Sequence, residues 1–127
     1  MYPVPLPLAF VALEEKAARA KVGGVLGRYG FSLAGPHDSW PEAAAWLHQN
    51  TPHVAVVEFL SRNSDALRIC RALTASDIPT VLYSTRDEQL GLPAELKGVP
   101  FLVMPDKEFM VLKRLATLHN ERLVRRL

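Results

Sequence analysis

The sequence has a single cysteine, and it lacks both long apolar runs and a strong excess of one charge. Cys70 is alone among 127 residues, so neither a disulfide framework nor a cluster of thiolate metal ligands can form within one chain. No apolar stretch approaches the roughly 20 residues that a membrane-spanning helix needs. The 15 basic and 13 acidic residues nearly balance, which disfavours a protein that binds nucleic acid over its whole surface.

The composition is typical of a folded domain. Hydrophobic residues make up 49% of the chain and charged residues 22%, which predicts a single domain over residues 8–127. Residues 1–7 form a proline-rich tail without a basic leader, so we expect no signal peptide and a cytoplasmic location. Cys70, within an apolar stretch, is predicted to be a small core residue.

Five short apolar runs recur at intervals of roughly 20–26 residues, a spacing that leaves room for a helix between strands. These runs cover residues 8–13, 31–34, 54–59, 80–83 and 100–103. Their continuous apolar character, without alternation, is typical of strands that are buried on both faces of a parallel sheet.

Helical patterns lie between these runs. Residues 15–29 favour a helix, and the three glycines within it indicate close packing on a sheet. The sequence Ser39-Trp-Pro-Glu42 is a capping box that predicts a helix to about Gln49. A third helix begins at Asn63 or Ser64 and ends near Leu73.

The last third of the chain is less regular. Gly91 and Pro93 predict that any helix over residues 86–98 is short or distorted, and Asp106 is expected to cap a long final helix. The alternation of strands and helices predicts an α/β, flavodoxin-like (βα)5 sandwich of three layers. Its five-stranded parallel sheet has the order 2-1-3-4-5. Ligands of such sheets bind beyond the carboxyl ends of the strands, where Glu58 and Ser84 lie.

Five segments together resemble a known family. They are Leu13-Glu14-Glu15, Gly30-Phe31, Pro52 to Glu58, Ile78 to Ser84, and Phe101 to Pro105. In order and spacing they are similar to the receiver domain of bacterial two-component response regulators, over residues 8 to about 120. The resemblance implies a place in phosphorelay signal transduction.

The resemblance also implies a phosphorylation pocket and shows where this chain departs from it. The family holds Mg²⁺ with two acidic residues after strand 1 and the phosphoacceptor aspartate after strand 3. Here Leu13 stands at the first acidic position and Glu14 at the second, unless a shift of one residue uses Glu14 and Glu15 instead. Glu58 replaces the phosphoacceptor aspartate. Ser84 retains the hydroxyl after strand 4, whereas Met104 stands in place of the phosphate-binding lysine.

These departures predict a degenerate pocket. A thioether at Met104 offers no positive charge to a phosphoryl group. The longer arm of Glu58 would misplace an acyl phosphate by about 1.5 Å, and displacements of that order cost about a hundredfold in rate. Glu14 and Glu58 could form a weak Mg²⁺ site. Alternatively, the cationic side chain of Arg62, Arg86 or Lys107 could lie beside the two carboxylates in place of a metal ion.

We therefore expect a pseudo-receiver that is not an enzyme, needs no cofactor and binds a protein. The resemblance implies a histidine kinase or a downstream signalling protein as the partner. It also implies a switch aromatic, Phe101, and a partner surface made of Phe101, Phe109, Lys113 and Arg114. The apolar last face is also compatible with a homodimer.

Two alternatives from other classes stay open. The first is a working, Mg²⁺-dependent phosphoacceptor receiver. The second is a nucleic-acid binder that uses the basic end of the final helix, with Arg125 and Arg126. A solvated helix end is the simpler account of these arginines. The four histidines have no metal-ligand spacing and are expected in loops or on the surface.

Overall fold

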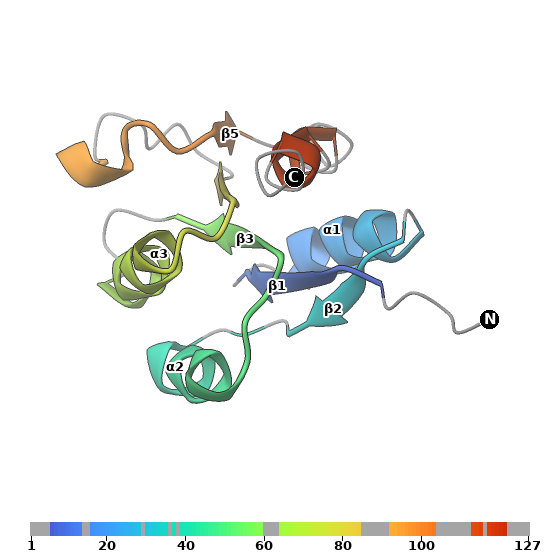
Figure 1. Ribbon diagram of the computed structural model, residues 1–127, viewed down its shortest axis with the longest axis horizontal. Coiled ribbons are helices and arrows are strands. Elements are labelled where there is room, and N and C mark those ends of the chain that lie inside the picture. The colour runs from blue at the N-terminus through green and yellow to red at the C-terminus, as the bar shows by residue number, and fades with distance from the viewer. Residues whose placement is uncertain are drawn as a thin grey trace.

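Strands and helices alternate along the chain (Figure 1). The computed structural model describes residues 6–13, 16–28, 30–35, 37, 39–59, 64–84, 92–103, 113–115 and 117–121. The strands are β1 (Leu8–Ala12), β2 (Ser32–Ala34), β3 (Val54–Glu58), β4 (Thr80–Ser84) and β5 (Phe101–Val103). The helices are α1 (Lys16–Arg28), α2 (Trp40–Gln49), α3 (Ser64–Ala75) and the 3-10 helix η2 (Ala94–Leu96). Residues 113–115 and 117–121 are also helical and are called the C-terminal helical segment.

The five strands form one parallel sheet in the order β2-β1-β3-β4-β5. Strand β1 lies between β2 and β3, so the chain crosses from one edge of the sheet back over its centre. The register pairs Val56 of β3 with Val11 of β1 and with Val81 of β4. The predicted flavodoxin-like fold and its strand order are therefore confirmed.

Helices cover both faces of the sheet, with α1 on one face and α2 and α3 on the other (Figure 1). Alternate residues of the central strands point to opposite faces, which divides the interior into two apolar cores. The first core joins α1 and the C-terminal helical segment to the sheet, through Val22, Leu26 and Leu115. The second core joins α2, α3 and η2 to the other face.

Helix α2 begins as its sequence predicts. The Ser39 side chain caps the helix by accepting a hydrogen bond from the backbone N–H of Glu42 at 3.4 Å. Pro41 occupies the first turn, where its missing N–H costs no helical hydrogen bond. At the other end, the backbone N–H of Asn50 donates to the Trp46 carbonyl at 3.0 Å. The Ser39 cap thus fixes where α2 begins.

Within residues 92–98, the described part of the segment predicted to hold a short or distorted helix, the structure has one short helix. The three residues Ala94–Leu96 form a single 3-10 turn that follows Pro93. Leu92 and Leu96 are buried in the second core and hold this turn against the sheet. The predicted start of the final helix at Asp106 lies outside the described residues. Within the part of the chain that is described, no helix is long and apolar enough to span a membrane.

The glycines of α1 correct one expectation. An added Cβ at Gly23 would meet Leu33 Cδ1 at 3.4 Å, an ordinary contact. Gly24 and Gly27 have nothing within 4 Å of such an atom and are exposed. The prediction that all three glycines permit close packing on the sheet is therefore wrong for Gly24 and Gly27, which face outward.

The lone cysteine lies in the second core, on α3. Cys70 has no exposed surface, and burial raises the pKa of its thiol from 9.0 to about 12. The thiolate is the reactive form of cysteine, so at neutral pH this side chain is an inert core residue. Its predicted role in the core is consistent with this position.

Gly35 sits at a turn that no other residue can form without strain. Its φ of +118° belongs to the region that L side chains avoid. An added Cβ would also contact the Val11 carbonyl oxygen and would lie 2.9 Å from the backbone nitrogen of His37. This close approach lets the His37 N–H donate to the Val11 carbonyl at 2.8 Å.

We predict that Gly35→Ala lowers the free energy of unfolding by about 1–3 kcal/mol, because strain and a backbone clash act together. The matched control is Gly27→Ala, an exposed helical position that should be neutral or more stable by up to about 1 kcal/mol. Urea unfolding followed by circular dichroism measures both. Equal stabilities of the two variants would contradict the role given to Gly35.

Candidate functional site

Two polar residues end neighbouring strands at the carboxyl edge of the sheet. Glu58 is the last residue of β3, and Ser84 is the last residue of β4. Both are buried, with 7% of Glu58 and none of Ser84 exposed. The pairing continues one residue beyond β3, where the Phe59 N–H donates to the Tyr83 carbonyl at 2.8 Å. The edge is therefore a closely packed end of the sheet.

Sequence reasoning missed a third residue at this edge. The register of β3 and β4 places Tyr83 directly opposite Glu58. Tyr83 is 2% exposed and belongs to the first core. Ser84 lies one position further along β4. A count from the predicted starts of the two strands, Val54 and Thr80, would have placed Ser84 opposite Glu58, because the observed register instead pairs Thr80 with Ala55.

The other predicted pocket residues cannot be placed. Glu14, Glu15 and Met104 lie outside the described residues, and so do the three cationic residues that we considered as replacements for the lysine. The convergence of Glu14, Glu58 and Ser84 therefore stays a prediction. So does the absence of a positive charge beside Glu58, which rests on the sequence position of Met104.

The described residues do not by themselves make a magnesium site. No group of three or more histidine, cysteine, aspartate or glutamate side chains in the described ranges is arranged to hold a metal ion. Glu58 supplies one carboxylate, whereas a hard divalent cation takes several oxygen ligands. The weak Mg²⁺ site at Glu14 and Glu58 remains a prediction.

One of the histidines expected in loops or on the surface lies in a loop but is buried. His37 is 6% exposed, and its ring stacks on Phe10 with 4.9 Å between ring centroids. Its Nδ1 lies 3.2 Å from Oε1 of Glu42, and Nε2 has no hydrogen-bond partner among the described residues. The turn at Gly35 causes this burial, because it directs the chain back onto β1. Sequence spacing gave no signal of this contact.

The predicted partner surface is partly visible. Phe101 begins β5, is half-buried and packs against the second core. Lys113 and Arg114 are exposed on the C-terminal helical segment. Phe109 lies outside the described residues. The described part of the predicted partner surface thus has two exposed cationic side chains and one aromatic side chain that packs partly against the second core.

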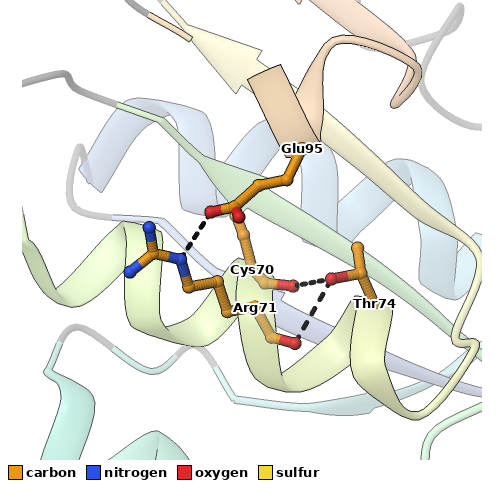
Figure 2. A network of polar contacts seen from close by, with 4 residues as sticks. All are labelled: Cys70, Arg71, Thr74 and Glu95. Atoms are coloured by element: carbon orange, nitrogen blue, oxygen red, sulfur yellow. Dashed lines mark hydrogen bonds and ion pairs between the residues drawn. The ribbon is translucent and has the colours of Figure 1, made fainter. Parts of the chain in front are cut away.

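A polar network ties α3 to η2, the turn that precedes β5 (Figure 2). Nε of Arg71 donates to Oε1 of Glu95 at 2.5 Å, and both side chains are about half exposed. On the same helix, the Thr74 hydroxyl donates to the carbonyls of Cys70 and Arg71, at 2.9 and 3.2 Å. The ion pair therefore bridges α3 and η2 at the surface.

Comparisons with known proteins identify the fold. No protein-family model and no curated protein sequence matches the chain. Solved structures do match: a response regulator from Thermotoga maritima is 18% identical, with a TM-score of 0.71, and the match covers 91% of this chain and 98% of that one. A response regulator receiver protein from Burkholderia phymatum is 14% identical, with a TM-score of 0.75 and coverages of 90% and 95%.

A sensor protein from Polaromonas sp. JS666 is also similar, at 17% identity, a TM-score of 0.74 and coverages of 91% and 97%. The chain therefore has the fold of response-regulator receiver domains over nearly its whole length. The resemblance predicted from the strand ends is confirmed for the fold. Sequence identities of 14–18% show a shared fold, whereas the chemistry of the pocket depends on this chain's own residues.

We predict that the Arg71–Glu95 ion pair contributes less than about 1 kcal/mol, because both side chains are half solvated and exposed pairs are screened. A double-mutant cycle with Arg71→Ala and Glu95→Ala, measured by urea unfolding, gives the coupling energy. The coupling should shrink in high salt. Pairing Arg68→Ala with Glu95→Ala is the control and should give no coupling. A salt-independent coupling well above this value would show that the bridge is a major support of η2.

Proposed function

We propose that this chain is a receiver-type signalling module of the bacterial cytoplasm that binds a protein partner without being phosphorylated. The receiver fold supports a role in phosphorelay signalling as the general class. The single observation that carries the finer proposal is the identity and position of Glu58. This glutamate ends β3 at the carboxyl edge, the place that the resemblance gives to a phosphoacceptor aspartate.

Two physical arguments favour the loss of phosphotransfer. Glu58 carries one more methylene than aspartate, so its carboxylate reaches a different point in a closely packed edge where Tyr83 and Ser84 are also buried. Met104 follows β5 in the sequence, where the family has a lysine. Phosphoryl transfer depends on fixed positive charge around the transferred group, and a thioether supplies none.

Glu58 also offers a reason why such a domain could signal constantly. The carboxyl group of Glu58 lies one methylene beyond that of an aspartate, toward the place where a phosphorylated aspartate would carry its phosphoryl group. We infer that Glu58 imitates the negative charge of a phosphorylated aspartate and keeps the domain in an active-like state. Under this proposal Glu58→Asp, which restores the shorter side chain of an unphosphorylated receiver, and Glu58→Gln, which replaces the carboxylate by an amide of the same shape, both weaken partner binding. Unaltered affinity in both variants would contradict it.

The partner would dock on β5 and the C-terminal helical segment. Lys113 and Arg114 are exposed there, and an acidic patch on the partner would complement them. Phe101 at the start of β5 is half-buried beside the same edge. A histidine kinase or a downstream signalling protein fits this description by the family resemblance.

The first test is chemical. Incubation of the wild-type chain with acetyl phosphate and Mg²⁺ should leave its intact mass unchanged, because Met104 replaces the family's lysine and Glu58 its aspartate. The double variant Glu58→Asp/Met104→Lys restores both family residues and serves as the matched control that a covalent adduct is detectable. An acid-stable or hydroxylamine-sensitive adduct on wild-type Glu58 would establish the rival function, a working phosphoacceptor receiver.

The second test concerns the partner surface. Once a partner has been identified by crosslinking, Lys113→Glu/Arg114→Glu should weaken its binding by about tenfold or more, since each reversal replaces attraction with repulsion. The matched control is Lys21→Glu/Arg28→Glu, two cationic residues exposed on α1. Titration calorimetry with and without acetyl phosphate measures all three proteins. Equal losses in both double variants, or binding only after phosphorylation, would contradict the proposal.

A further inference from the structure

A cavity lies at the end of the molecule opposite Glu58, between α2 and α3. Its volume is about 230 Å³. Pro52, just before β3, and Ile78, just before β4, line it, so it opens at the amino edge of the sheet. The two helices are joined at their first turns, where the Trp40 N–H donates to Oδ2 of Asp65 at 3.2 Å. Both helices cover the same face of the sheet (Figure 1).

The cavity has an apolar base and a polar mouth. Leu73 and Ile78, which line it, are buried in the second core and form the base. Trp40, Ala44 and Leu47 recur on one face of α2 and form one wall. Opposite them, α3 contributes only the small side chain of Ala72 beside Leu73. Ala44 and Ala72 line the space with small side chains, one from each helix, which leaves it unfilled.

The helix ends at the mouth have their carbonyls satisfied. The Trp46 carbonyl accepts from the backbone N–H and from the side-chain amide of Asn50, at 3.0 and 2.9 Å. The Leu73 carbonyl accepts from the N–H groups of Ser76 and Ile78. These two carbonyls are therefore already paired within the protein. The polar side chains left at the mouth are those of His48, Thr51 and Ser76.

The charge of the cavity selects among ligand classes. None of the described residues that line it is lysine, arginine, aspartate or glutamate, and His48 is its one titratable side chain. Nucleotides and other phosphorylated compounds need cationic or N–H clusters that this wall does not provide. A charged ligand would lose hydration without gaining an ionic partner. An uncharged, planar compound meets an indole wall, an apolar base and hydroxyl groups at the rim.

We propose that the groove between α2 and α3 is a binding site for a small uncharged aromatic compound of one or two rings that carries a hydroxyl or amide group. The volume lies below that of sites for drug-sized ligands, which sets the upper limit of size. This inference goes beyond the proposed function and does not depend on it. The domain would then bind a small molecule at the amino edge of the sheet, whereas Glu58 lies at the carboxyl edge.

The chain carries its own reporter for a test. Trp40 lines the cavity, whereas Trp46 does not and instead packs near Phe10, with 5.7 Å between ring centroids. In a Trp46→Phe variant, Trp40 is the one remaining tryptophan. Titration with benzyl alcohol and benzamide should change its fluorescence saturably. Benzoate and benzylamine, matched in size but charged, should bind at least about tenfold more weakly.

A second experiment compares a variant whose new side chain fills the cavity with a control variant in which the cavity stays open. Ala72→Leu places a larger side chain in the gap and should weaken benzamide binding by about tenfold or more. Ala75→Leu makes the same change on α3 at an exposed position that does not line the cavity, and should leave binding unaltered.

If Trp46→Phe does not fold, ligand-observed NMR on the leucine variants with both tryptophans present gives the same comparison. Absence of saturable binding, equal affinity for charged and neutral probes, or equal losses in the two leucine variants would overturn the proposal. Phosphorylation assays are unaffected by any of these outcomes, so the two proposals fail separately.

Discussion

The burial of the central strands on both faces is the constraint on which the rest of the structure depends. Every residue of β3 and of β4 is buried, and β1 is nearly so. Strands with apolar side chains on both faces need helices on both sides, and parallel pairing needs a crossover between successive strands. Polar chemistry is thereby confined to the two ends of the sheet. Glu58 and Ser84 lie at one end, and the groove between α2 and α3 lies at the other.

The sequence carried most of the architecture because buried strands and helix caps are local signals. The uninterrupted apolar runs located all five strands, and Ser39 with Glu42 located the start of α2. Contacts set by tertiary structure were not accessible in this way. The burial of His37 depends on the backbone approach at Gly35, and the outward position of Gly24 depends on how α1 rotates against the sheet. Neither leaves a periodic trace in the sequence.

For the candidate site, the sequence predicted the type and strand position of a functional residue but not which side chains lie beside it. The position of Glu58 at the end of an apolar run was enough to place it at the carboxyl edge, where the structure has it. Its neighbour Tyr83 escaped notice because a tyrosine at the end of an apolar strand looks like core, which it also is. The register between β3 and β4 decides which side chains share a face. Register follows from the pairing of two segments, so a single segment does not reveal it.

The two strands at the margins of the sheet have a consequence for the behaviour of the chain in concentrated solution. Both β2 and β5 are only three residues long, and they flank strands of five residues. A short margin offers few unpaired amide and carbonyl groups to a strand from another molecule. Self-association by strand addition, the route toward fibrils, is therefore restricted at both margins.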